Sequence, residues 1–302
     1  MRAEIVIIGG GFAGTSAAIT LARANRSVVL IDNAQPRNRF SEHSHGILGF
    51  ESTPPSQILS AGHREFISFG GESITASAKS LVNNQHNLGT WTTHLSDGEK
   101  IQSRHVLIAT GISDKLPEVA GLKELWGSRV FHCPYCHGYE IKSKNLAIIG
   151  GENPNFTFRI TELLTKWTNN VTFFPNGMHV PEDQKRRLEK LKVKTDPRLV
   201  QEVTESTHCS TGVKIGLNEE IIDYEACFTG PSFIPNDSLL RAAGCVVKDG
   251  WVQTEHGLTS QKGLWAAGNV VSSPDQVPQA IGAGAATAIK IDQELFNEDM
   301  NQ

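Results

Sequence analysis

The sequence lacks several features that would each point to a class of protein. It has no run of about 18 consecutive apolar residues, so we expect no membrane-spanning helix. Its five cysteines among 302 residues are too few for a disulfide framework, which favours a reducing, cytoplasmic compartment. The net charge is −4 and no basic patch is interleaved with aromatic residues, which argues against nucleic acid or an anionic membrane as a partner.

A low-complexity tract is also missing, and the opening residues do not read as a signal peptide. Their apolar stretch is short and runs directly into a glycine-rich turn, so we expect a strand there. Hydrophobic residues make up 39% and charged residues 20% of the 302-residue chain, which is ordinary for a soluble globular protein. This length predicts about two domains.

A complete strand–turn–helix–strand pattern occupies the beginning of the chain. The β-branched run at 4–8 is followed by GGGFAG, which places Gly9, Gly11 and Gly14 at G-x-G-x-x-G spacing. Gly9 would make the tight turn, Gly11 would let a pyrophosphate approach the backbone, and Gly14 would let the helix close on the strand. Asp32 ends the next strand, where an acid binds ribose hydroxyls. The pattern predicts a dinucleotide-binding domain.

A second unit of the same kind, residues 145–174, breaks the rule at its turn. Glu152 stands where the second glycine is needed, and Asn155 where a small residue would pack closely. A carboxylate would then face the phosphates, and Asn153 followed by Pro154 adds a stiff turn. No arginine cluster follows the next strand to bind a 2′-phosphate. We therefore expect a Rossmann-like domain that has lost its nicotinamide nucleotide.

Two further strands end in small-residue turns, at 105–111 and at 263–270, and both would bring backbone close to a ligand. They flank the second unit, which predicts a discontinuous first domain. The expected bounds are 1–113 with 246–302 for the first domain and 117–242 for the second. The fold class is α/β, with two Rossmann-like nucleotide-binding domains, the second inserted into the first.

The stretch FHCPYCHGYE (131–140) carries two cysteines at C-x-x-C spacing. Zinc would need four ligands, and the flanking His132 and His137 cannot converge with both cysteines on one ion. A structural disulfide would constrain very little chain. A redox-active pair, Cys133 and Cys136, is favoured, and we expect no metal site. His137 has an ordinary pKa suited to moving a proton between thiol and thiolate.

Taken together, these motifs resemble the low-molecular-weight thioredoxin reductase family over nearly the whole chain. The resemblance rests on GGGFAG, the ATG turn, the C-x-x-C in the second domain and the late AAGNV. CPYCHGYE and PRNRFSEHSHGILGF are similar to a subgroup that includes FAD-dependent dithiol oxidases, which close disulfides in gliotoxin- and holomycin-type natural products. Thioredoxin reductases have Asp where this chain has His137 and Asn269, a departure from the NADPH-to-thioredoxin pattern.

The resemblance implies FAD in the first domain and a catalytic set of Cys133, Cys136 and His137. Cys136 would face the flavin and Cys133 would exchange with the substrate. The implied FAD-binding residues are Gly9, Gly11, Phe12, Ala13, Gly14, Asp32, Asn33, Arg37, Asn38, His45, Thr110, Gly111, Gly268, Asn269, Gln276 and Val277.

Three hypotheses for function stay open from the sequence. The first is an NADPH-independent flavoenzyme that oxidises a dithiol, passing electrons through the cysteine pair and FAD to oxygen or another acceptor. The second is a reductase of thioredoxin or a similar partner, with NADPH, ferredoxin or reduced flavin as donor. The third is a non-catalytic flavin-binding or redox-sensing protein. The substrate would be a small dithiol or disulfide or a thioredoxin-like protein, and the family implies a homodimer.

Overall fold

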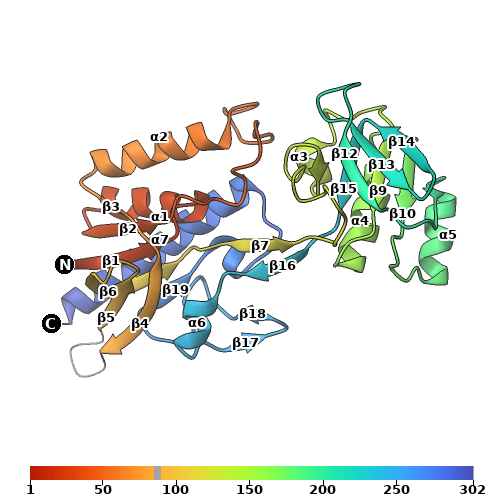
Figure 1. Ribbon diagram of the computed structural model, residues 1–302. Coiled ribbons are helices and arrows are strands. Elements are labelled where there is room, and N and C mark those ends of the chain that lie inside the picture. The colour runs from red at the N-terminus through yellow and green to blue at the C-terminus, as the bar shows by residue number, and fades with distance from the viewer. Residues whose placement is uncertain (85–89, 302) are drawn as a thin grey trace. The chain divides into compact units, whose positions relative to one another are not determined.

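The computed structural model describes residues 1–84 and 90–301, in two units that each have their own central sheet (Figure 1). The first unit comprises residues 1–39, 47–113 and 235–302, and the second comprises 40–46 and 114–234. The return crossing lies at 234/235, earlier than the expected 242–246, and the segment 40–46 groups with the second unit. This division follows the contacts between residues within each unit. The expected domain bounds stay a prediction.

The sheet of the first unit has the order β3-β2-β1-β6-β5-β4, and β19 pairs with β6 outside this path. The strands β1, β2, β3 and β19 run parallel to their neighbours, while β4, β5 and β6 form antiparallel pairs. Their bounds are β1 Arg2–Ile8, β2 Val28–Asp32, β3 Glu72–Thr75, β4 Ala78–Asn84, β5 Thr90–Leu95, β6 Lys100–Ile108 and β19 Leu264–Ala266.

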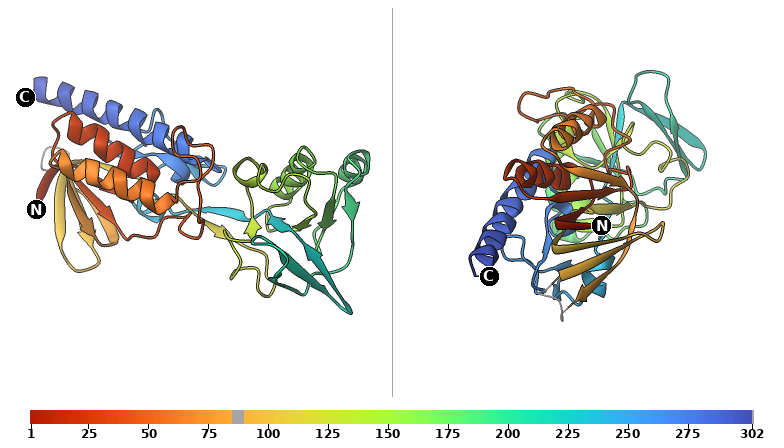
Figure 2. Two further views of the ribbon diagram at one scale, coloured as in Figure 1. Left: turned by 90° about the horizontal axis from the view of Figure 1, so that it is seen from above. Right: turned by 90° about the vertical axis from the view of Figure 1, so that its left-hand side faces the viewer.

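Three helices, α1 (Phe12–Arg23), α2 (Pro55–Ser68) and α7 (Val277–Met300), lie on one face of this sheet (Figures 1 and 2). Because side chains alternate along a strand, Ile5 and Ile7 pack under these helices while Val6 and Ile8 face the opposite core. The opposite core is closed by α6 (Ser238–Ala242), by β18 (Trp251–Val252), which pairs with β17 (Val247–Lys248), and by the 3₁₀ turn η1 (Gly268–Val270).

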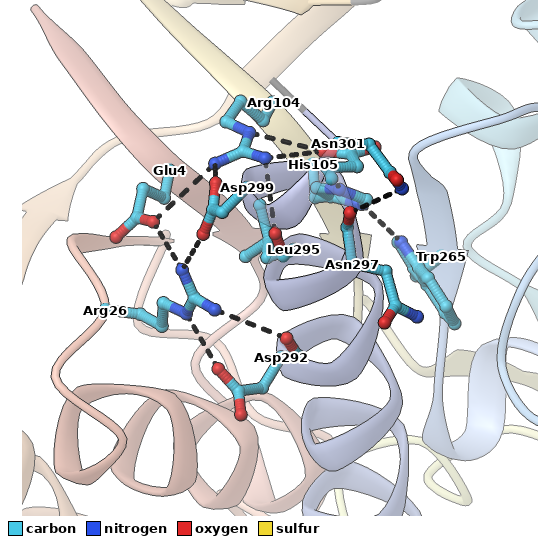
Figure 3. A network of polar contacts seen from close by, with 11 residues as sticks. Glu4, Arg26, Arg104, His105, Trp265, Asp292, Leu295, Asn297, Asp299 and Asn301 are labelled. Atoms are coloured by element: carbon cyan, nitrogen blue, oxygen red, sulfur yellow. Dashed lines mark hydrogen bonds and ion pairs between the residues drawn. The ribbon is translucent and has the colours of Figure 1, made fainter.

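The C-terminal part of α7 is held to the sheet by ion pairs around two arginines (Figure 3). The guanidinium of Arg26 contacts carboxylate oxygens of Glu4, Asp292 and Asp299 at 2.9, 2.7 and 2.9 Å. That of Arg104 contacts Asp299 at 2.5 Å and Glu298 at 2.8 Å. Buried His105 lies beside them and accepts a hydrogen bond at Nδ1 from the indole of Trp265, at 2.8 Å. The helix end therefore has a defined position on the sheet.

The second unit has a five-stranded parallel sheet in the order β11-β10-β9-β15-β8 and a three-stranded antiparallel sheet, β12-β13-β14. The strands are β8 Val130–Phe131, β9 Leu146–Ile149, β10 Val171–Phe174, β11 Lys194–Thr195, β12 Glu202–Glu205, β13 Val213–Leu217, β14 Glu220–Tyr224 and β15 Ala226–Thr229. The helices are α3 Pro134–His137, α4 Pro154–Leu164 and α5 Glu182–Lys190. The chain passes between the units along β7 (Ile112–Lys115) and β16 (Ser232–Pro235), which pair with each other.

These sheets and helices confirm the predicted α/β class with two Rossmann-type units. The predicted strand at 4–8, the helix after GGGFAG and the strand VTFF are all present. None of the helices within 1–84 and 90–301 has the length and apolar content that crossing a bilayer requires.

Candidate functional site

The first glycine turn, between β1 and α1, has the geometry that a dinucleotide pyrophosphate requires. Gly9 has φ of +104°, and a Cβ there would lie 2.5 Å from the carbonyl oxygen of Ala109. A Cβ on Gly14 would lie 1.8 Å from the carbonyl oxygen of Gly9, so only glycine allows the helix to approach this closely. Gly11 has open space around its Cβ position, with no described atom within 4 Å.

Gly11 is the N-cap of α1 and brings no side chain that would accept from the first-turn amides. These amides therefore remain available, at the positive end of the helix dipole, for an anionic ligand. On the other side of the turn, Asp32 Oδ1 accepts a hydrogen bond from the Gly10 amide at 3.0 Å, which fixes the carboxylate beside the turn. This cradle fits the pyrophosphate and ribose of a dinucleotide such as FAD.

The other predicted FAD residues of the first unit lie at the start of α1, after β2 and β6, in η1 and at the start of α7, and some of their polar groups already have protein partners. The Thr110 hydroxyl donates to the carbonyl oxygen of Asn236 at 2.7 Å. Asn269 Oδ1 accepts from the Asp275 amide at 2.9 Å, and Gln276 caps α7 in a reciprocal arrangement with Gln279. These bonds shape the turns themselves. The assignment of Asn33, Arg37, Asn38, Phe12, Ala13, Gly111, Gly268, Asn269, Gln276 and Val277 to FAD stays a prediction.

The second glycine turn, between β9 and α4, differs from the first at the helix N-terminus. Asn153 is the N-cap of α4, and its Oδ1 accepts from the Phe156 amide at 3.1 Å. Pro154, the first residue of the helix, has no amide hydrogen to offer. The amide of Asn153 itself donates to the carbonyl oxygen of Gly230 at 3.2 Å. Two of the donors that would bind a phosphate are thus used within the protein and a third does not exist.

The side chains at the two unexpected positions of this turn have distinct surroundings. The Glu152 carboxylate contacts the Lys115 ammonium at 2.8 Å, and its backbone oxygen accepts from Ser232 at 3.0 Å. Asn155 is exposed and is the second residue of α4, so the third helical position, which Gly14 occupies in α1, is occupied here by Phe156.

Cys133 and Cys136 form a disulfide across the single-turn helix α3. Cys133 is the N-cap, and its carbonyl oxygen accepts from the amides of Cys136 and His137, each at 3.2 Å. Tyr135, within this helix, and Tyr139, which follows it, are exposed. Phe131 lies in the core of the second unit because it belongs to strand β8.

His137 is the last residue of α3, and its imidazole packs against Phe131 with ring centroids 4.1 Å apart. Burial away from water, and then the proximity of His45, lower the pKa of His137 to about 4. The imidazole is therefore neutral at pH 7. It can pass a proton on but does not hold one at rest.

His45 was predicted among the FAD contacts, but its segment, 40–46, groups with the second unit. Its ring centroid lies 6.3 Å from that of His137, and its Nδ1 lies 3.6 Å from a carboxylate oxygen of Glu140. Glu140 was not singled out from the sequence, although it lies within the CPYCHGYE motif.

The sequence analysis also missed that Asn153 caps α4. The sequence signal for this cap is an asparagine directly before a proline, which is favoured at the first position of a helix.

Comparison with known proteins agrees with this arrangement. The family model described as pyridine nucleotide-disulphide oxidoreductase matches residues 3–284. The solved structure of HlmI is similar with a TM-score of 0.94 and 34% identity, covering 99% of this chain and 94% of that one. An oxidoreductase from Agrobacterium tumefaciens is similar with a TM-score of 0.89 and 30% identity, covering 98% and 99% of the two chains.

Among curated relatives, thioredoxin reductase tcpT of Claviceps purpurea is 29% identical over 186 residues, which is 58% of this chain and 56% of that protein. The match to thioredoxin reductase aclD of Aspergillus oryzae covers 57% of that protein, so this chain aligns with little more than half of either. Thioredoxin reductase sirT of Leptosphaeria maculans is 24% identical over 98% of this chain and 95% of its own length.

Proposed function

Because the chain belongs to the pyridine nucleotide-disulphide oxidoreductase family, and so is an oxidoreductase of a flavin-binding kind, we propose that it oxidises a dithiol to a disulfide without NADPH. The observation that carries this proposal is the contrast between the two glycine turns of one chain. Around Gly11 the first-turn amides of α1 are left to a ligand, while Asn153 and Pro154 remove the corresponding donors of α4. The first unit therefore offers helix N-terminal amides to an anionic coenzyme, and the second unit offers fewer of them.

The chemistry of the second unit lies in the Cys133–Cys136 disulfide. A substrate thiolate attacks Cys133, Cys136 leaves with the electron pair, and the second substrate thiol releases Cys133 to close the product disulfide. The bound flavin would supply a two-electron acceptor that restores the disulfide, and oxygen or another acceptor would take the electrons onward. The protein holds the two sulfurs at α3 and accepts the protons that the substrate thiols release.

A direct test compares two additions to the purified flavoprotein in air. Dithiothreitol should give hydrogen peroxide at a rate that depends on Cys133, and Cys133→Ser should abolish it. NADPH at micromolar concentration should leave the flavin absorbance unchanged. Rapid bleaching by NADPH would overturn the NADPH-independent part of the proposal.

The names of the curated relatives favour a second candidate, the reduction of thioredoxin or a similar partner. Its electrons would come from NADPH, ferredoxin or a reduced flavin. An anaerobic titration with each donor separates the two candidates, because only a reductase has its flavin reduced by one of them and then reoxidised by thioredoxin disulfide. Adding a small disulfide in place of thioredoxin disulfide in the reoxidation step then compares the two substrate classes.

We also propose that the chain forms a homodimer, as the family resemblance implies. Light scattering during size-exclusion chromatography measures the mass directly and would contradict this proposal if it gave the 32.9 kDa of a single chain.

A further inference from the structure

His45 and Glu140 form a pair that neither belongs to a glycine turn nor contributes a sulfur. His45 Nδ1 lies 3.6 Å from Glu140 Oε1, with side chains 15% and 39% exposed. His45 comes from the loop segment 40–46, and Glu140 follows α3 closely in the chain. Imidazole is the side chain most often used to take up and release protons near neutral pH.

The same imidazole lies beside His137. The two ring centroids are 6.3 Å apart, with the planes nearly perpendicular at 78°. His43 is a further neighbour of His45, with ring centroids 6.4 Å apart. The charged and titratable groups of the second unit that face His45 in the described contacts are thus Glu140, His137 and His43.

His137 follows Cys136 directly but cannot be the final acceptor of a proton. Its ring packs on Phe131, and burial keeps its pKa at about 4. A proton that reaches His137 near pH 7 must leave it again. The neighbouring group with a carboxylate at its side is His45.

We propose that His45, which has the Glu140 carboxylate beside it, accepts through His137 the proton that a substrate thiol gives up when it opens the Cys133–Cys136 disulfide. This inference rests on the proposed exchange of that disulfide with a dithiol. The first substrate thiol loses its proton to His137 and so to His45, and its sulfur bonds to Cys133 while the Cys133–Cys136 bond breaks. Cys136 leaves as a thiolate with the electron pair and takes the proton of the second substrate thiol. That second sulfur bonds to the first and releases Cys133. The dithiol loses two electrons, the protein disulfide gains two, and the two protons lie on His45 and Cys136.

The test uses two reductants that differ in their need for a base. Dithiothreitol must lose a proton before it attacks, whereas a trialkylphosphine attacks a disulfide with a lone pair that carries no proton. Disulfide opening is followed by acid quenching, alkylation and mass measurement of the peptide that contains Cys133 and Cys136. This readout needs neither turnover of the flavin nor an electron acceptor.

We expect His45→Gln to slow opening by dithiothreitol at pH 7 by about tenfold or more, since general bases typically contribute about 10²–10⁴-fold. Glu140→Gln should slow it in the same direction, and the phosphine rate should stay within about twofold for both variants. Above pH of about 9 the difference should disappear, because thiols then ionise without help. The matched control is His179→Gln, an exposed histidine of the same unit.

Equal slowing with both reductants would mean that His45 only supports the local fold, and the proposal would be overturned. Unchanged dithiothreitol rates in both variants would overturn it as well. The proposed function fails separately, when the wild-type disulfide opens normally but no peroxide follows. A wild-type disulfide that resists dithiothreitol at every pH would overturn both.

Discussion

The imidazole of His137 lies with its centroid 4.1 Å from the ring of Phe131, the buried residue at the end of strand β8. This contact places a titratable group of the CPYCHGYE motif against the core of the second unit. The apolar surroundings disfavour the charged imidazolium, and the nearby His45 disfavours it further, so the pKa of His137 falls to about 4.

This lowered pKa predicts a defined pH dependence of stability. Between pH 6.5 and about 4 the unfolded chain binds a proton at His137 that the folded chain does not, so the free energy of unfolding falls as the pH falls through this window. The full loss is about 3 kcal/mol. Urea unfolding of wild type and His137→Gln at pH 7.5, 6, 5 and 4, values spaced about one unit apart across the window, measures it. The variant should lose less stability than wild type over this range, and parallel curves would contradict the prediction.

The Asn153 cap of α4 predicts that Asn153→Ala lowers the free energy of unfolding. Its Oδ1 accepts from the Phe156 amide at 3.1 Å, and removal of an N-cap asparagine costs about 1 kcal/mol. Urea unfolding should show a lower midpoint with an unchanged slope. Asn155→Ala, two residues along in the same turn and exposed, is the control and should be near neutral. Equal effects of the two substitutions would argue against the cap.

Alanine substitutions of Gly14 and Gly11 should have different effects, the first on the stability of the apoprotein and the second on FAD binding. Gly14→Ala places a methyl group 1.8 Å from the Gly9 carbonyl oxygen, so we expect the apoprotein to lose about 1–3 kcal/mol or more. Gly11→Ala meets open space and should cost the apoprotein no more than about 1 kcal/mol, the usual cost of alanine at an N-cap.

The flavin content of the two purified variants separates these effects. Gly11→Ala should retain less FAD at near-normal apoprotein stability, because its methyl group stands where the pyrophosphate would approach. Absorbance at the flavin band relative to protein, together with unfolding of the apoprotein, gives both quantities. A Gly11→Ala protein with a full complement of FAD would place the pyrophosphate elsewhere.

The hydrogen bond between Trp265 and His105 predicts a fixed tautomer. An indole N–H can only donate, so His105 Nδ1, which faces the Trp265 indole in Figure 3, must be the unprotonated nitrogen. Nε2 of His105 lies 3.4 Å from Glu298 Oε2. Trp265→Phe leaves this buried acceptor without its donor and should cost about 1–3 kcal/mol. Nitrogen chemical shifts of the His105 ring report the tautomer in wild type. Trp251→Phe, a half-buried indole on β18, is the control for loss of a tryptophan.

Much of the first unit was predictable because its signals are local. The strand, glycine turn and helix that begin the chain follow one another directly. The last helix, α7, begins at Val277 because Gln276 and Gln279 cap it reciprocally. The strand expected at 263–270 is only Leu264–Ala266, since the chain turns at Gly268, which has φ of +73°.

The sequence by itself determined the α/β pattern, the dinucleotide turn and the C-x-x-C pair, because each depends on residues within one short segment and on the backbone that those residues allow. Tertiary structure alone decided that His45 lies with His137 and Glu140, that Glu152 pairs with Lys115, and that Phe131 is buried. Those relationships join segments that are separated along the chain, and which of them meet depends on how strands and loops are packed. No local pattern carries that information.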